Sequence, residues 1–253
     1  MVRRCDVLAV GAHPDDVEIG CGGTVARLAA AGRQVGILDL TAGEMSTRGT
    51  LERRTREAEA AATALGATWR SCLDLPDGRL STGLAAQVAA VVGAVRGSGA
   101  RAVLLPDGDD PHPDHCAAAA LVRQACFLAG LIRWHPELGA PHRPRLAVSY
   151  PGPRQVPAVA LVIDVSAVYN RKRAALAAHA SQFGPGDGTA THLSTGHFLI
   201  AIEGRDRACG NVIGVELGEG FAVAGALAAD EVVWLLEKRE GVESQGEKLA
   251  GKS

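Results

Sequence analysis

The chain of 253 residues has few aromatic side chains, no closely spaced cysteines and no long apolar run. Phe, Trp and Tyr together make up 4% of it, so a surface that stacks nucleic-acid bases is not expected. None of the six cysteines forms a C-x-x-C pair, which excludes a zinc finger and favours small buried residues in a reducing cytosol. An apolar run of about 18 residues, which a transmembrane helix requires, does not occur.

An excess of charge of one sign is also missing. Lys and Arg number 26 and Asp and Glu number 28, which leaves a net charge of −2. This balance argues against a nucleic acid or an anionic membrane as the main partner. The basic N-terminus is followed by only a short apolar segment, residues 7–10, before His13 and Asp15. A signal peptide has a longer apolar region, so we expect a cytoplasmic protein.

Short apolar runs alternate with amphipathic stretches through the first half of the chain. Such runs are typical of strands buried on both faces, and the stretches between them are typical of covering helices. This alternation predicts right-handed crossovers and a parallel sheet, hence a three-layer, Rossmann-like α/β fold. The expected strands are 7–10, 35–40, a segment within 68–75, and 101–105, and the expected helices are 25–31, 51–65, 82–95 and 116–129.

The second half is less regular and is expected to add further strands. No linker divides the chain, so residues 1–236 are predicted to form one domain. Residues 237–253 are charged and contain Gly and Ser, which predicts a flexible tail. The expected elements are strands at 146–150 and 158–165, a helix at 166–178 with Ser166 as its N-cap, and a helix at 194–209.

Two loops rich in His and Asp follow the first and the fourth predicted strands. In a 3-2-1-4 strand order these strands flank the switch point, where ligands bind beyond the carboxyl ends of the strands. Two loops about 95 residues apart in sequence are therefore expected to meet in one cleft. The first contributes His13, Asp15 and Asp16, and the second contributes His112, Asp114 and His115.

The first loop does not have the pattern of a dinucleotide site, which needs G-x-G-x-x-G after the strand. Gly11 is followed by His13, and the adjacent Asp15 and Asp16 would repel a pyrophosphate. Imidazole and carboxylate together suit Zn²⁺ and its neighbours in the first transition row. Three protein ligands and one open position make a catalytic metal site, and His13, one Asp of the pair and His115 would supply the three.

The segments A-H-P-D-D-V-E at 12–18 and P-H-P-D-H at 111–115 resemble the LmbE-like, or PIG-L, family of zinc-dependent N-acetylglucosamine deacetylases. Residues 40–50 and 75–78 are similar to the segments that follow the second and third strands in this family. Ser181-Gln182-Phe183 and the stretch 214–221 resemble the branch that deacetylates N-acetylglucosaminyl malate in bacillithiol biosynthesis. The resemblance extends to about residue 225.

The resemblance implies roles for the first motif and for His115. His13, Asp16 and His115 match the zinc ligands of the family, with one Zn²⁺ or another divalent transition metal per chain. Asp15 matches its general base, which accepts a proton from water. Zinc lowers the pKa of water and polarises a carbonyl, which amide hydrolysis needs because the amide is a poor electrophile.

The resemblance also implies roles for three other residues. His112 matches the histidine that polarises the amide carbonyl and protonates the leaving amine. Asp114 matches the carboxylate that pairs with His112, and such a partner would raise the pKa of the imidazole. Arg54 matches an arginine near the substrate pocket.

The implied activity is removal of the N-acetyl group from an N-acetylglucosaminide, with N-acetylglucosaminyl malate as the expected substrate. Two positions depart from that branch, because Asp107 stands where an aromatic residue is common and Pro111 where Arg is common. The same chemistry on an inositol-linked thiol precursor, a chitobiose-like sugar or a natural-product glycoside is the alternative. A non-catalytic metal- or nucleotide-binding module and a two-metal phosphoesterase are alternatives of other classes. Members of the family often form trimers or hexamers, so a homo-oligomer is expected.

Overall fold

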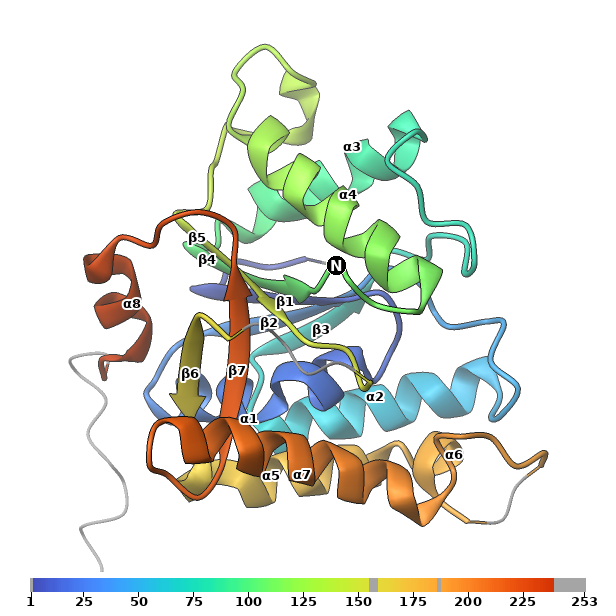
Figure 1. Cartoon of the computed structure of the whole chain (residues 1–253). Helices are drawn as coiled ribbons and strands as arrows, with labels where there is room; N and C mark the ends of the chain where they lie inside the picture. Colours follow the sequence, from blue (N-terminus) through green and yellow to red (C-terminus); the bar gives the residue numbers. More distant parts are fainter. Residues whose placement is uncertain (1, 155–158, 186–187, 239–253) are drawn as a thin grey trace, which may run out of the picture.

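The predicted strands and one further strand form a single mixed sheet. The computed structural model describes residues 2–154, 159–185 and 188–238, and over these ranges the sheet has seven strands in the order β3-β2-β1-β4-β5-β7-β6 (Figure 1). The first five strands are parallel, and β7 runs antiparallel to both of its neighbours. The strands are β1 (Val7–Gly11), β2 (Val35–Asp39), β3 (Trp69–Cys72), β4 (Ala102–Pro106), β5 (Leu146–Tyr150), β6 (Leu161–Asp164) and β7 (Gly218–Val223).

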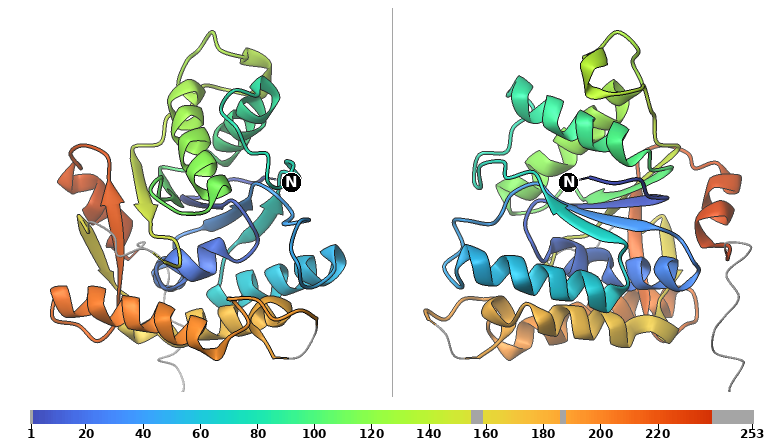
Figure 2. Two further views of the ribbon diagram at one scale, coloured as in Figure 1. Left: turned by 45° about the vertical axis from the view of Figure 1, so that its right-hand side comes forward. Right: turned by 180° about the vertical axis from the view of Figure 1, so that it is seen from behind.

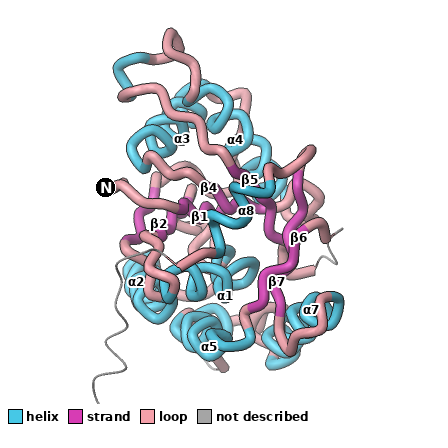
Figure 3. The backbone as a smooth tube through the Cα atoms, turned by 90° about the vertical axis from the view of Figure 1, so that its left-hand side faces the viewer, coloured by secondary structure: helices cyan, strands magenta, loops and turns pink. Residues whose placement is uncertain are grey.

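Helices cover both faces of the sheet and make the expected three-layer α/β fold. In Figures 1 and 2, α3 and α4 lie on one face, and α1, α2 and α5 lie on the other. The side view in Figure 3 shows the strands between these two groups of helices. The helices are α1 (Asp16–Ala30), α2 (Leu51–Leu65), α3 (Ala85–Ser98), α4 (Pro113–Ala129), α5 (Tyr169–Ala178), α6 (Ala180–Phe183), α7 (Gly196–Val212) and α8 (Ala229–Leu236), with short 3₁₀ turns at Pro136–Leu138 and Ser166–Val168.

The apolar run of β1 is explained by burial on both faces. Val7 and Ala9 pack in the core on the α1, α2 and α5 side, whereas Leu8 and Val10 pack in the core on the α3 and α4 side. Successive side chains of a strand point to opposite faces, so a strand covered on both faces must be apolar throughout. The continuous apolar run was therefore a sound basis for predicting a central strand.

Helix α2 occupies the predicted range because both of its ends are specified locally. The Thr50 side chain accepts a hydrogen bond from the Arg53 N–H at the start of the helix. Gly66 closes it in the left-handed conformation, with φ 79°.

Two predictions for other elements were wrong, and further elements were not predicted. Helix α1 begins at Asp16, nine residues before the predicted start, because several glycines hide its periodicity. Ser166 begins a 3₁₀ turn instead of capping α5, and its hydroxyl donates to Asp164 Oδ1. Strand β7 and helix α8 were not predicted, and β7 in particular contains two glycines that weaken its strand pattern.

Helix α1 contains a kink that connects it to the far side of the sheet. Cys21 has non-helical angles, with φ −145°, and the kink frees backbone N–H groups in the next turn. The carboxylate of Glu219 on β7 accepts hydrogen bonds from the N–H groups of Gly23 and Thr24, at 2.9 and 2.6 Å. Gly20 is required beside the kink because a Cβ there would lie 2.1 Å from the ring of Tyr150.

All six cysteines are free thiols, and four of them are buried, as the sequence predicts for small core residues. Within the described part of the chain, no helix has both the length and the apolar character that crossing a membrane demands. The predicted tail lies outside the described residues from position 239 onward.

Candidate metal centre and active site

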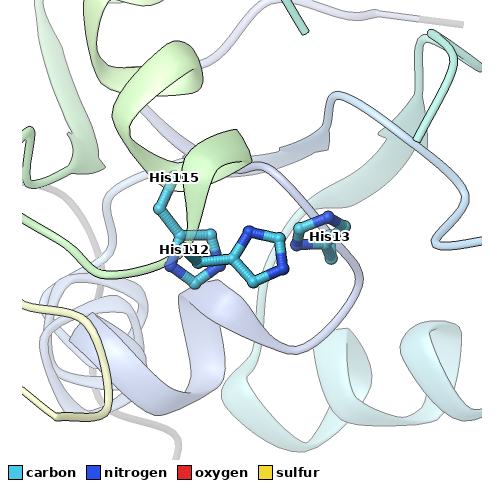
Figure 4. A group of neighbouring side chains, drawn as sticks. All are labelled: His13, His112 and His115. Carbon is cyan, nitrogen blue, oxygen red and sulfur yellow. The ribbon is translucent and has the colours of Figure 1, made fainter. Parts of the chain in front are cut away.

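The two loops rich in His and Asp meet at the carboxyl ends of β1 and β4, as predicted from the strand order. Figure 4 shows the imidazoles of His13, His112 and His115 side by side. The ring centroids of His112 and His115 are 4.6 Å apart, and those of His13 and His112 are 4.9 Å apart. All three rings line a cavity of about 470 Å³. A cavity with converging polar groups at the switch point of an α/β sheet is the expected position of an active site.

Asp15 and Asp16 are placed differently although they are adjacent. Asp16 is the first residue of α1, and its carboxylate accepts the His13 N–H at 2.8 Å. Asp15 precedes the helix with φ 136°, a backbone conformation that is strained for any residue with a Cβ. Strain of this kind persists only where the surrounding structure enforces it, so the loop holds the two carboxylates in separate orientations.

Asp16 lies between the two predicted histidine ligands. Its Oδ1 is 3.1 Å from His115 Nε2, and its Oδ2 is 3.6 Å from His13 Nδ1. One carboxylate and two imidazole nitrogens thus face one another, a donor set that suits a borderline metal ion such as Zn²⁺. The predicted ligands His13, Asp16 and His115 are therefore brought together by the fold.

The opposite nitrogen of each of these imidazoles faces a further carboxylate. His13 Nε2 is 3.1 Å from Asp77 Oδ1 and 3.4 Å from Asp114 Oδ2. His115 Nδ1 is 3.2 Å from Asp110 Oδ2. Carboxylates in these positions are typical of metal sites, where they fix the orientation of ligand histidines.

The surplus of carboxylates has a strong effect on both imidazoles. Burial lowers the pKa of His13, but the nearby carboxylates of Asp114, Asp16 and Asp77 outweigh burial and raise it to about 12. Burial likewise lowers the pKa of His115, and the negative charges of Asp16 and Asp110 raise it to about 10. The site thus attracts positive charge, which protons supply when no metal ion is bound, so the residues present fit a divalent cation.

Two groups of three side chains in the described residues place their ligand atoms within 4.8 Å of one another, and the predicted set His13, Asp16 and His115 is not one of them. One is His13, His112 and His115, and the other is His13, Asp77 and Asp114. Both share His13 with the predicted set, so this histidine is the common member of every candidate centre.

Asp15 is buried within reach of the predicted ligands and of Arg54. Burial raises the pKa of Asp15 to about 6, with the positive charge of Arg54 opposing and the negative charge of Asp16 adding to the rise. A carboxylate with a pKa near neutrality is suited to accept and return a proton. Arg54 lies 3.7 Å from Asp15 Oδ2, but it donates to the carbonyl oxygens of Gly43 and Pro14. Its guanidinium thus links the loops that follow β1 and β2, and Arg54 also lines the cavity.

The predicted pairing of Asp114 with His112 was wrong. The Asp114 carboxylate faces His13 and accepts the N–H groups of Gly78 and Leu80, at 2.7 and 3.4 Å. Its backbone N–H donates to His112 Nδ1 at 3.2 Å, because His112 is the N-cap of α4. The pKa of His112 is lowered, by burial and then by the positive charges of His115 and His13, where the sequence predicted that it would be raised.

The cavity is also lined by residues to which the sequence assigned no role, among them Met45, Arg154, His192 and Phe198. His197 is exposed and does not line the cavity. His192, five residues earlier, does line it and packs edge-on against Phe198. The helical spacing alone could not distinguish these two histidines.

Asp77 and Asp110 are the two carboxylates of the site that the sequence interpretation missed. Asp77 belongs to the L-P-D-G segment after β3, and Asp110 precedes His112 by two residues. Both follow strands that end at the same edge of the sheet as β1, which is the signal that could have found them.

The fold and the cluster of carboxylates and imidazoles define an α/β enzyme with a candidate cation centre at the switch point. Residues 8–126 match the family model PIG-L, described as GlcNAc-PI de-N-acetylase. A relative from Rhodococcus opacus (strain B4), a 1D-myo-inositol 2-acetamido-2-deoxy-alpha-D-glucopyranoside deacetylase, is 31% identical over 70% of this chain and 81% of its own. The chain belongs to the PIG-L family, whose named relatives are deacetylases.

Two other comparisons agree with this assignment. A diacetylchitobiose deacetylase from Thermococcus kodakarensis is 31% identical, with 70% of each chain covered. The crystal structure of the conserved protein TT1542 from Thermus thermophilus superposes with a TM-score of 0.80 and 37% identity, covering 88% of this chain and 96% of that one. This likeness confirms the predicted three-layer α/β architecture with its additional C-terminal strands.

Proposed function

We propose that the chain hydrolyses the N-acetyl group of an N-acetylglucosaminide and uses one Zn²⁺ held by His13, Asp16 and His115. The products are acetate and a free amine. The observation that carries this proposal is the placement of Asp16 between the two imidazoles, with Asp15 beside them in a strained conformation. Named relatives of this family act on N-acetylated glucosaminides, which supports the same bond as the target here.

Asp15 is the group that we assign to proton transfer. A bound divalent ion supplies Lewis acidity, which polarises the amide carbonyl and lowers the pKa of water. The pKa of Asp15 is raised to about 6, so its carboxylate accepts a proton from the attacking water near neutral pH. The same proton is then available for the leaving nitrogen, which must be protonated because an amide anion is a very poor leaving group. Water and amide thereby yield acetate and amine with no other reactant.

His112 is better suited to donate a hydrogen bond than to carry a positive charge. Its Nδ1 accepts the Asp114 N–H, so the proton of the neutral ring is on Nε2. Protonation of Nδ1 would break this helix-capping bond, and burial lowers the pKa of His112 further. A neutral Nε2–H in the cavity stabilises the oxyanion that develops on the amide carbonyl.

The aglycone that we favour is malate, as in the bacillithiol branch, because the outer cavity offers a cation. Arg154 lines the cavity, is exposed, and makes no ion pair with any described residue. Arg is common at the position that Pro111 occupies here, and the Arg154 guanidinium can provide the positive charge in its place. Arginine is suited to bind a carboxylate with two hydrogen bonds. Arg54 does not serve this purpose, since it donates to backbone carbonyls.

The test is a deacetylase assay of the zinc-loaded protein with N-acetylglucosaminyl malate, its inositol-linked analogue and diacetylchitobiose. Acetate release and free amine are measured together, and the Asp15→Asn protein is the matched control. Preference for the malate compound supports the full proposal, and preference for another of the three retains the deacetylase and overturns the aglycone. Stoichiometric metal with no hydrolysis of any of the three would favour the non-catalytic metal-binding module.

A further inference from the structure

A carboxylate after β3 contacts the proposed metal ligand after β1. Asp77 is 9% exposed, and its Oδ1 lies 3.1 Å from His13 Nε2. The rest of the residue is tied in place: Oδ2 accepts the Met45 N–H at 2.9 Å, and the Asp77 N–H donates to Glu44 Oε1 at 2.7 Å. Only Oδ1 is therefore left for His13.

We propose that Asp77 is a positioning residue that holds the proton of His13 on Nε2 and so presents Nδ1 to the metal. The inference rests on the metal centre of the proposed function. A carboxylate can only accept, so a neutral imidazole that faces it must carry its proton on the facing nitrogen. The other nitrogen of His13, Nδ1, is 3.6 Å from Asp16 Oδ2, which is too long for a good hydrogen bond. Nδ1 is thus the nitrogen whose lone pair is open to a cation.

The second histidine ligand uses the opposite nitrogen. His115 directs Nδ1 toward Asp110 and Nε2 toward Asp16 Oδ1, at 3.2 and 3.1 Å. The structure therefore assigns Nδ1 of His13 and Nε2 of His115 to the same ion. This asymmetry follows from where the two supporting carboxylates stand, since one comes from the loop after β3 and the other from the loop after β4.

Asp114 assists Asp77 but is the weaker partner of His13. Its Oδ2 is 3.4 Å from His13 Nε2 and already accepts the Gly78 N–H at 2.7 Å. The atoms His13 Nε2, Asp77 Oδ1 and Asp114 Oδ2 are also close enough together to hold an ion themselves. Because backbone N–H groups already donate to both aspartates, we assign these carboxylates to hydrogen bonding. A second bound ion is one of the results that the experiment below can detect.

The experiment uses the full chain loaded with zinc and compares three proteins: wild type, Asp77→Asn and Asp74→Asn. Asp74 lies in the same loop, is exposed, and does not contact His13, so it controls for the loss of one negative charge. In Asp77→Asn the amide oxygen is retained by the Met45 N–H, and the amide NH₂ then faces His13 Nε2 and opposes the proton there. Three quantities are measured: bound zinc per chain, zinc affinity by competition with a chelator, and the metal-bound nitrogen of each histidine by ¹⁵N NMR.

We expect one zinc per chain, His13 bound through Nδ1 with a proton on Nε2, and His115 bound through Nε2. Asp77→Asn is expected to weaken zinc binding by roughly 10–100-fold, as loss of a supporting carboxylate typically does, while Asp74→Asn matches wild type. Zinc on His13 Nε2, two ions per chain with one lost in Asp77→Asn, or an unchanged affinity in that variant would each overturn the inference. The nitrogen assignment in wild type decides the matter even if Asp77→Asn does not fold.

These outcomes are distinguishable from failure of the proposed function. A protein that binds one zinc through His13 Nδ1 but hydrolyses no glucosaminide retains the inference and loses the activity. A protein that hydrolyses its substrate with zinc on His13 Nε2 retains the activity and loses the inference.

Discussion

Two buried groups of charged side chains contact helix α1, and they differ in the origin of their positive charge. In the first, the fully buried Lys172 Nζ lies 2.6 Å from carboxylate oxygens of both Asp206 and Glu219. Tyr169 donates to Asp206, and the backbone of α1 donates to Glu219, so among the described residues no buried side-chain polar atom of these three charged groups lacks a partner. The positive charge of this group is the ammonium of Lys172, which belongs to the chain itself.

In the second group the positive charge is exchangeable. Asp16, Asp77 and Asp114 surround His13, whose charge depends on a proton or on a metal ion in its place. Also on α1, Glu18 Oε2 lies 3.6 Å from His179 Nε2, and neither this oxygen nor the two ring nitrogens of His179 have a hydrogen-bond partner among the described residues. The comparison teaches that the Lys172 group is complete without a ligand, whereas the His13 group is completed by what it binds.

The largest expected effect would break the exchangeable group. His13→Ala removes the one residue common to every candidate centre, so we expect loss of stoichiometric zinc and of all measurable deacetylation. His197→Ala is the matched control, since His197 is exposed and outside the cavity. Metal content and acetate release measure both variants. Full zinc occupancy in His13→Ala would refute the ligand assignment.

The next effect separates the two adjacent aspartates of the exchangeable group. Asp15→Asn should retain zinc and lower kcat by roughly 10²–10⁴-fold, because a proton acceptor is removed and a ligand is not. Asp16→Asn should instead weaken zinc binding. Single-turnover rates and chelator competition distinguish the two results. Equal loss of metal in both variants would show that the roles are shared.

A substitution in the group around Lys172 should change the stability of the fold and leave the metal site unchanged. Lys172→Met leaves Asp206 and Glu219 buried without their cation, and removing one partner of a buried ion pair costs about 3–5 kcal/mol. Arg173→Met, at the exposed neighbouring position, is the control. Denaturant unfolding measures the loss, and zinc affinity of the folded protein is expected to stay the same. A Lys172→Met protein as stable as wild type would contradict the comparison.

The pH dependence of zinc binding sharpens the difference between fixed and exchangeable charge. The pKa values of His13 and His115 are raised to about 12 and about 10, so both imidazoles hold protons at neutral pH without metal. Zinc must displace these protons, and its affinity should therefore fall as pH falls, by roughly 10–100-fold per pH unit. Chelator competition between about pH 6 and 8, with proton release from calorimetry in two buffers, tests this. A pH-independent affinity would count against the protonated metal-free state.

The smallest expected effect lies outside both groups, at the rim of the cavity. Arg154→Ala should raise KM for the malate-linked substrate by about 10-fold, because a charge-assisted hydrogen bond is lost, and should leave kcat nearly unchanged. The inositol-linked substrate should show no such change, and Arg56→Ala on the exposed face of α2 serves as control. An equal change for both substrates would show that Arg154 does not recognise the carboxylates.

The edge of the sheet that carries the His and Asp residues could be predicted from sequence because these residues occupy two short motifs after strands with plain apolar runs. The strand order predicted that His13, one aspartate of the pair and His115 meet there, and the family resemblance chose Asp16 as that aspartate. Asp77 was not assigned, although it follows β3 at the same edge of the sheet, because its contact with His13 depends on where the loop after β3 places the carboxylate. The role of Asp114 was misjudged because sequence proximity to His112 suggested a side-chain pair, whereas helix capping directs the carboxylate elsewhere. Strand β7 escaped prediction because its glycines conceal the alternation of a strand.

The kink of α1 has a consequence for the order in which contacts form while the chain is synthesised. All proposed metal ligands have left the ribosome once His115 has emerged, and the span that matches the family model ends at residue 126. The N–H groups of Gly23 and Thr24, in the helix that begins with Asp16, acquire their carboxylate acceptor only when Glu219 has been synthesised. The nascent chain thus carries all the proposed ligands for about a hundred further residues of synthesis before these two N–H groups have their acceptor on β7.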